Sequence, residues 1–123
     1  MWPETSLAIV LAFAHLTVGV NIFVSHFSGT ISTLTLTSSN DGANYDLTAN
    51  GSLYVGAQPS WLTFNSTTRT LYVSDEYWGS ASIFAVNAAR NGGLTQASKT
   101  PAPVNGAVAS GQYGEGKFLA SAH

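Results

Sequence analysis

Three β-prone runs follow one another between Ser60 and Asn87: Ser60-Trp-Leu-Thr-Phe-Asn65, Thr70-Leu-Tyr-Val-Ser-Asp-Glu76 and Ser80-Ala-Ser-Ile-Phe-Ala-Val-Asn87. Thr, Val, Ile, Tyr, Phe and Trp fill these runs, and their branched or ring side chains suit a pleated, half-buried surface. A short polar loop over residues 65–69 separates the first two runs, and residues 77–79 make the next corner. The stretch therefore predicts an antiparallel meander.

The same strand–turn–strand pattern recurs on both sides of this stretch. Ile22-Phe-Val-Ser-His26 aligns with Leu71-Tyr-Val-Ser-Asp75 at an offset of 49 residues, and residues 30–36 align with residues 80–86 at an offset of 50. A partial third copy, Phe118-Leu-Ala-Ser-Ala-His123, aligns with the run that begins at Leu71 at an offset of 47. A β-repeat of about 40–50 residues is typical of propeller blades, which have four strands each. The sequence therefore predicts an all-β fold built from antiparallel four-stranded blades.

The repeat also sets the expected boundaries. We expect a partial propeller over residues 20–123, with blade one over 21–57, blade two over 58–100 and the start of blade three over 101–123. In blade one, an outer strand over 45–49 and an edge segment over 52–55 are expected on either side of an Asn50-Gly51 turn. In blade three, a strand over 107–110 should precede a turn over 111–116. Since a propeller closes with about 4–8 blades, these two and a half blades predict an N-terminal fragment of a longer protein.

The first 19 residues are predicted to be a signal peptide. Residues 7–20 are apolar apart from His15 and Thr17, and this length fits a secretory core better than a membrane span. Gly19 offers a small residue for cleavage, although the segment before residue 7 carries no Lys or Arg. Two glycosylation sequons, at Asn50 and Asn65, lie in predicted turns and favour secretion. The alternative is that residues 7–20 form an apolar core strand.

Composition excludes several classes of function. Only 8% of the 123 residues are charged, the net charge is −2, and the four basic residues are scattered, so no basic patch is expected for a nucleic acid. The chain has no cysteine, and its three histidines lack ligand spacing, so neither a disulfide framework nor a metal site is expected. No stable membrane span and no cofactor-binding motif are expected either.

The candidate catalytic residues are Asp75, Glu76 and His123. The repeat places them, with His26, at the end of the second strand of successive blades, and such ends lie on one face of a propeller. A carboxylate and an imidazole there could together activate water against a substrate carbonyl. The alternative is structural: Asp75 and Glu76 cap a turn by accepting backbone hydrogen bonds, and His26 serves only the local structure.

Three aromatic residues are candidates for stacking against a ligand. Trp61 is expected in the core between blades because it starts the innermost strand beside Pro59, with a sugar-stacking role as the alternative. Tyr77 and Trp78 follow the acidic pair in a turn, where exposure would favour a surface that binds carbohydrate or another small ring-shaped ligand.

Several segments together resemble the N-terminal part of the seven-bladed β-propeller lactonases, a family that includes 6-phosphogluconolactonase-type enzymes and carboxy-cis,cis-muconate cyclases. The segments are Gln58-Pro-Ser-Trp-Leu62, Leu71-Tyr-Val-Ser-Asp-Glu76, Gly92-Gly-Leu-Thr95, Pro103-Val-Asn-Gly106 and Phe118–His123. The resemblance implies hydrolysis or formation of small sugar-acid or muconate-type lactones without an organic cofactor. It also implies that the family's catalytic His, Glu and Arg residues lie in later blades, so none is assigned to a position here.

Two classes of function follow. The first is a secreted lactonase-like propeller whose partner is a small-molecule lactone or a carbohydrate, with residues 1–123 too few to be active alone. The second is a non-catalytic secreted module that binds glycan or protein, because propellers support both kinds of function.

Overall fold

A computed structural model describes residues 19–39, 41–56, 58–77, 82–101 and 105–122. These parts of the chain are entirely β-strand, turn and loop. The nine described strands are β1 (Val20–His26), β2 (Thr30–Ser38), β3 (Tyr45–Tyr54), β4 (Pro59–Asn65), β5 (Thr70–Asp75), β6 (Ser82–Ala88), β7 (Leu94–Pro101), β8 (Ala109–Tyr113) and β9 (Phe118–Ala122). Within the described ranges there is no helix that could cross a membrane.

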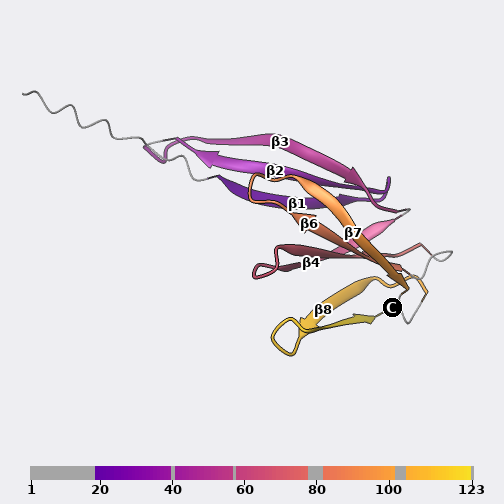
Figure 1. The fold of residues 1–123 in the computed structure, drawn as a ribbon. Coiled ribbons are helices and arrows are strands. Elements are labelled where there is room, and N and C mark those ends of the chain that lie inside the picture. The colour runs from indigo at the N-terminus through magenta and orange to yellow at the C-terminus, as the bar shows by residue number, and fades with distance from the viewer. Residues whose placement is uncertain (1–18, 40, 57, 78–81, 102–104, 123) are drawn as a thin grey trace, which may run out of the picture.

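The strands form three antiparallel sheets in chain order. The first sheet is β1-β2-β3, the second is β4-β5-β6-β7 and the third is β8-β9. Figure 1 shows the three sheets stacked one on another, with the second sheet between the first, in violet and magenta, and the third, in yellow. Strand β4 contacts both β1 and β8, and the outer strands β3 and β7 contact each other. The expected all-β, antiparallel architecture is therefore confirmed, and the second sheet has the expected four strands.

The outer strand of the first sheet differs from the prediction. Residues 45–54 form one continuous strand, β3, with no turn at Asn50-Gly51. The register explains this: Thr33 pairs with Gly51 and Leu34 pairs with Ala49, so Asn50 is an extra residue accommodated as a bulge. An extra residue also occurs in the outer strand of the second sheet, where Ala85 pairs with Ser98 and Val86 pairs with Gln96. An Asn-Gly pair predicts a turn, but the same residues are also favoured at β-bulges, so the pair alone does not distinguish the two.

The third sheet begins later than predicted. Strand β8 covers Ala109–Tyr113, so residues 111–113 continue the strand instead of opening the turn. The turn occupies residues 114–117, where Gly114, Glu115 and Gly116 all have positive φ. Three consecutive left-handed residues, two of them glycine, explain why the chain reverses there.

The core lies between the first and second sheets. Leu71 and Val73 of β5 are almost fully buried, as are Phe84 and Val86 of β6, and they pack with Ile31 of β2. Their cross-strand pairing, Leu71 with Val86 and Val73 with Phe84, places all four on one face of the second sheet. The opposite, outer face of the first sheet is exposed at three alternating residues of β1: Val20, Ile22 and Val24.

Side-chain hydrogen bonds join neighbouring sheets. The buried Thr33 hydroxyl donates to the Gly92 carbonyl at 2.8 Å, which links the first and second sheets. The Thr63 hydroxyl donates to the Ser110 carbonyl at 2.8 Å, which links the second and third. Since each bond joins residues far apart in the sequence, these bonds fix how the sheets are placed on one another.

Trp61 was expected in the core, and that prediction is wrong. Its side chain is 48% exposed. Pairing between β4 and β5 shifts between Pro59 and Trp61, and the pairing that results puts Trp61 opposite Ser74, on the face away from the Leu71–Val73 core. The two-stranded third sheet contacts that face at Thr63 and leaves nearly half of Trp61 open.

Candidate functional site

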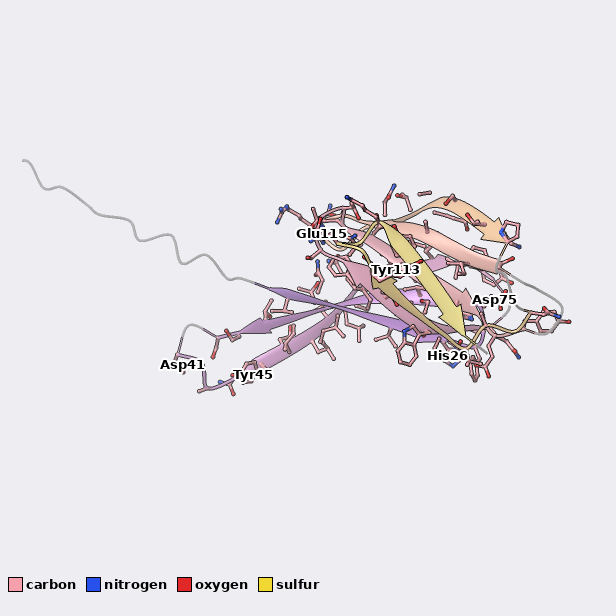
Figure 2. All side chains as sticks on the ribbon, turned by 90° about the horizontal axis from the view of Figure 1, so that it is seen from below. His26, Asp41, Tyr45, Asp75, Tyr113 and Glu115 are labelled. Atoms are coloured by element: carbon pink, nitrogen blue, oxygen red, sulfur yellow. The ribbon has the colours of Figure 1, made fainter. Side chains whose placement is uncertain are left out.

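The candidate site is one end of the strands, where β1 and β5 finish. His26 is the last residue of β1 and Asp75 is the last residue of β5, as the repeat predicts. Figure 2 shows the two labelled residues at the same end of the molecule, far from Asp41 and Tyr45 at the other end of the first sheet. The structure thus brings His26 and the acidic pair to one end, whereas His123 lies outside the described residues.

His26 is exposed and held by the tight turn that follows it. The Ser28 amide donates to Nδ1 of His26 at 3.0 Å, and the Ser28 hydroxyl lies 2.8 Å from the same nitrogen. A backbone N–H can only donate, so Nδ1 accepts and the ring proton sits on Nε2. The turn needs Gly29, which has φ +99° and whose added Cβ would lie 2.1 Å from the Gly56 carbonyl oxygen. The imidazole is therefore oriented with its donor nitrogen, Nε2, available to a ligand.

Asp75 is buried, with 2% of its surface exposed, and its carboxylate is engaged by the backbone. Its Oδ1 accepts hydrogen bonds from the Gln58 amide at 3.0 Å and from the Tyr77 amide at 3.1 Å. An added Cβ at Gly56 would lie 3.1 Å from Oδ2, so the chain also closes over the second oxygen. This geometry supports the structural alternative for Asp75, in which the carboxylate ties the end of β5 to the start of β4.

Glu76, next to these hydrogen bonds, has a half-buried side chain. Its backbone amide donates to the Gln58 carbonyl at 2.9 Å, which fixes the main chain at this residue. Unlike Asp75, Glu76 is not fully buried. Tyr77, the next residue, is 48% exposed, and Trp78 lies outside the described residues.

An open pocket lies beside His26, between the first and second sheets. Its volume is about 290 Å³, and its lining residues are Ser25, His26, Phe27, Pro59 and Ser60. Pro59 is paired with Asp75 across the sheet, so this pocket adjoins the acidic pair. Within the described part of the chain, the hydroxyl of Ser60 is buried without a hydrogen-bond partner.

Sequence reasoning missed Ser60 and Phe27 as lining residues. Ser60 lies in the irregular pairing between Pro59 and Trp61, and no periodicity in the sequence shows which way such a residue points. The Pro59-Ser60 pair at the start of β4 was the sequence feature that could have indicated this irregularity. Phe27 is 60% exposed, and an exposed aromatic at a turn is recognisable only once the turn is placed.

The arrangement can bind a small polar molecule. Nε2 of His26 is a donor at the pocket, with the Phe27 and Pro59 side chains as apolar walls, whereas the Ser60 hydroxyl is buried behind the pocket surface. No group of three or more His, Cys, Asp or Glu residues that could hold a metal ion occurs among the described residues.

Comparison with known protein families shows to which family the chain belongs. Residues 17–123 match the family described as lactonase, 7-bladed β-propeller. The chain belongs to this lactonase family. No curated protein and no solved structure was found to match the chain. For a lactonase-family chain, the three stacked antiparallel sheets and the predicted 40–50-residue repeat are the expected architecture.

Proposed function

We propose that residues 20–123 of this lactonase-family chain form propeller blades whose strand ends line a binding site for a small lactone. The three sheets correspond to blade one, blade two and the start of blade three. The family match over residues 17–123 carries this proposal, and it favours the sugar-acid or muconate-type lactones that the sequence resemblance implies. The pocket beside His26 supports it, because that pocket offers an oriented imidazole donor at one end of the strands.

In this proposal Nε2 of His26 binds the lactone, and the Phe27 and Pro59 side chains form the apolar walls. A lactone carries a carbonyl and a ring oxygen, both acceptors, which suit the Nε2 proton of His26. Asp75 acts as a positioning residue because its Oδ1 already accepts two backbone hydrogen bonds. Hydrolysis needs a positioned base, an acid and a stabiliser of the oxyanion around one point. The described residues supply a binding donor but do not assemble such a set.

A glycan-binding module is the second candidate. Trp61 and Tyr77 are each 48% exposed, and exposed aromatic rings are the side chains that pack on sugars. In this candidate the same end of the molecule presents aromatic platforms to an oligosaccharide, and no reaction takes place.

The proposal includes secretion with removal of residues 1–19. The apolar run over residues 7–20 supports it, because its length is that of a signal peptide core. N-terminal sequencing of the mature protein from producing cells should begin near Val20. Recovery of protein that still begins at Met1 would count against it.

Mapping of ligand contacts by 15N-edited NMR tests the function. Titration with a muconate-type lactone should shift the amides of residues 25–28 and 76–77 and leave those of residues 41–44 unchanged. His26→Gln should weaken binding about three- to tenfold, the range for one neutral hydrogen bond. Asp46→Asn, on the exposed strand β3, is the control and should leave binding unchanged. Shifts at Trp61 and Tyr77 with an oligosaccharide, and none with lactone, would favour the glycan-binding candidate instead.

A further inference from the structure

A second pocket lies at the opposite end of β1 from His26. It sits between the first and second sheets and has a volume of about 230 Å³. Gly19, Asn21, Phe23, Phe64, Arg69 and Arg90 line it. Since Asn21 and His26 are five residues apart on one strand, the two pockets are separated by roughly 16 Å.

This pocket brings two cations together in a chain with a net charge of −2. Arg69 and Arg90 are the only arginines of the sequence, and both line it, whereas none of its lining residues is acidic. Arg69 comes from the β4–β5 turn and Arg90 from the β6–β7 turn, so the fold assembles them from positions 21 residues apart. Two arginines and no acidic residue among the lining residues make this a site of positive potential that favours an anion.

The guanidinium of Arg69 is held in place before any ligand arrives. Its Nε donates to the Ala88 carbonyl at 2.8 Å, and Nη2 donates to the Ala89 carbonyl at 3.2 Å. The same group lies 5.5 Å from the centroid of the Phe64 ring, as in a cation–π contact. The backbone of Arg69 has φ +54°, a conformation that few residues other than glycine adopt. Because these contacts use only two of the five guanidinium N–H groups, the remaining donors can serve a ligand.

The other walls of the pocket are aromatic. Phe23 and Phe64 come from the first and second sheets, and their rings meet with centroids 5.4 Å apart and planes tilted by 46°. Phe64 is 39% exposed although the neighbouring core residues are buried. Asn21 is already occupied, since its Nδ2 donates to the Arg90 carbonyl at 3.0 Å and its Oδ1 accepts from Thr35. That bond to Arg90 holds the β6–β7 turn, and hence the second arginine, against the first sheet.

We propose that this pocket binds a small organic carboxylate that carries an apolar or ring-shaped part. Arg69 offers planar, bidentate donors of the geometry that a carboxylate takes, and Arg90 adds the second charge. The exposed Phe64 edge receives the apolar part of the ligand, which distinguishes an organic acid from a bare inorganic anion. This site is independent of the lactone proposal, since it shares no residue with the pocket beside His26.

Binding of benzoate to the full chain tests the proposal, with benzamide as its uncharged match. Benzoate should shift the amides of Asn21, Arg69 and Arg90 in 15N-edited NMR and bind at least about tenfold more tightly than benzamide, as expected for hydrogen bonds to a charged group. Affinity should fall as salt is raised, because the charges are near the surface. Inorganic phosphate should bind more weakly than benzoate, since it makes no use of Phe64.

Variants distinguish benzoate binding at this pocket from general electrostatic attraction to the protein. Arg90→Gln should weaken benzoate binding about tenfold, whereas Lys117→Gln, which removes the same charge from the exposed β8–β9 turn, should leave it unchanged. Arg69→Gln provides a second test and should also weaken binding, with the fold checked by its NMR spectrum. Equal binding of benzoate and benzamide, equal effects of Arg90→Gln and Lys117→Gln, or phosphate binding as tight as benzoate would each overturn the proposal.

Discussion

The amide of Gln58 donates a hydrogen bond of 3.0 Å to Oδ1 of Asp75. The same oxygen also accepts from the Tyr77 amide at 3.1 Å, so one buried carboxylate oxygen satisfies two backbone donors. Gln58 precedes β4 and Tyr77 follows β5, which means that Asp75 closes the strand pair at the end where the pocket beside His26 lies. An acid with this arrangement positions the site and is poorly placed to transfer protons.

Removal of the Asp75 carboxylate should therefore cost stability. Asp75→Ala leaves two partly buried N–H groups without this acceptor and should lower the free energy of unfolding by about 1–3 kcal/mol. Asp75→Asn keeps an acceptor oxygen and should cost clearly less. Urea denaturation measures both, with Glu76→Gln as the neighbouring control. If Asp75→Ala and Glu76→Gln cost the same small amount, the structural role of Asp75 is wrong.

The core and the exposed face of the second sheet should respond differently to truncation. Leu71 is 1% exposed, and Leu71→Ala should lower the free energy of unfolding by about 2–5 kcal/mol because it opens a cavity. Trp61 is 48% exposed, so Trp61→Ala should cost less than Leu71→Ala although it removes a larger side chain. Urea denaturation ranks the two variants. A larger loss for Trp61→Ala would place Trp61 back in the core.

Asn65 should matter for the fold whether or not its sequon is glycosylated. Its Oδ1 accepts from the amides of Thr67 and Thr68, and its Nδ2 donates to Oε1 of Gln112 in the third sheet at 2.9 Å. Asn65→Ala removes all three bonds and should cost about 1–3 kcal/mol of stability. Thr67→Ala destroys the same sequon but keeps these bonds, so it should be nearly neutral. Equal losses of stability in the two variants would show that the sequon, through glycosylation, is what counts.

Asp41 gives the chain a local dependence on pH. The Ser39 hydroxyl, which donates to Oδ1 of Asp41, and the Ala43 amide lower the pKa of this carboxyl below its usual value of 3.8. Because the folded pKa is the lower one, the stability that this carboxylate contributes is present above pH 3.8 and is lost as the pH falls through the folded pKa. Ser39→Ala should raise the pKa toward 3.8, and Ser38→Ala should leave it unchanged, as measured by carboxyl 13C NMR. An unchanged pKa in Ser39→Ala would refute the assignment.

The sequence predicted strands well where pattern and turn chemistry agree. The run Leu71–Asp75 alternates between two faces and is bounded by turn residues, and the observed β5 differs from it by one residue. Prediction failed where the strands are irregular, at the Asn50 bulge and at the shifted pairing beside Trp61. Bulges change which face a residue occupies, and a period of two carries no information about them.

The candidate site, too, could be predicted from the sequence only in part. The repeat placed His26 and Asp75 at one end, because equivalent strand ends share a face of the stack. It could not show that backbone amides occupy the Asp75 carboxylate, since those amides belong to Gln58 and Tyr77 on different segments. The arginine pocket could not be predicted either, because its lining combines residues of the first and second sheets and forms only when these sheets pack.

The rate of lactone hydrolysis by the purified chain tests the central claim, which is that these residues bind a lactone without forming a complete catalytic set. The account predicts that residues 1–123 hydrolyse gluconolactone- and muconolactone-type substrates no faster than buffer, while NMR detects lactone at the His26 end. The pocket beside His26 is open to water, which weakens electrostatic contacts and loosens the positioning that sets the rate. Hydrolysis well above the buffer rate that is abolished by Glu76→Gln, with the fold intact, would contradict the account and make Glu76 catalytic.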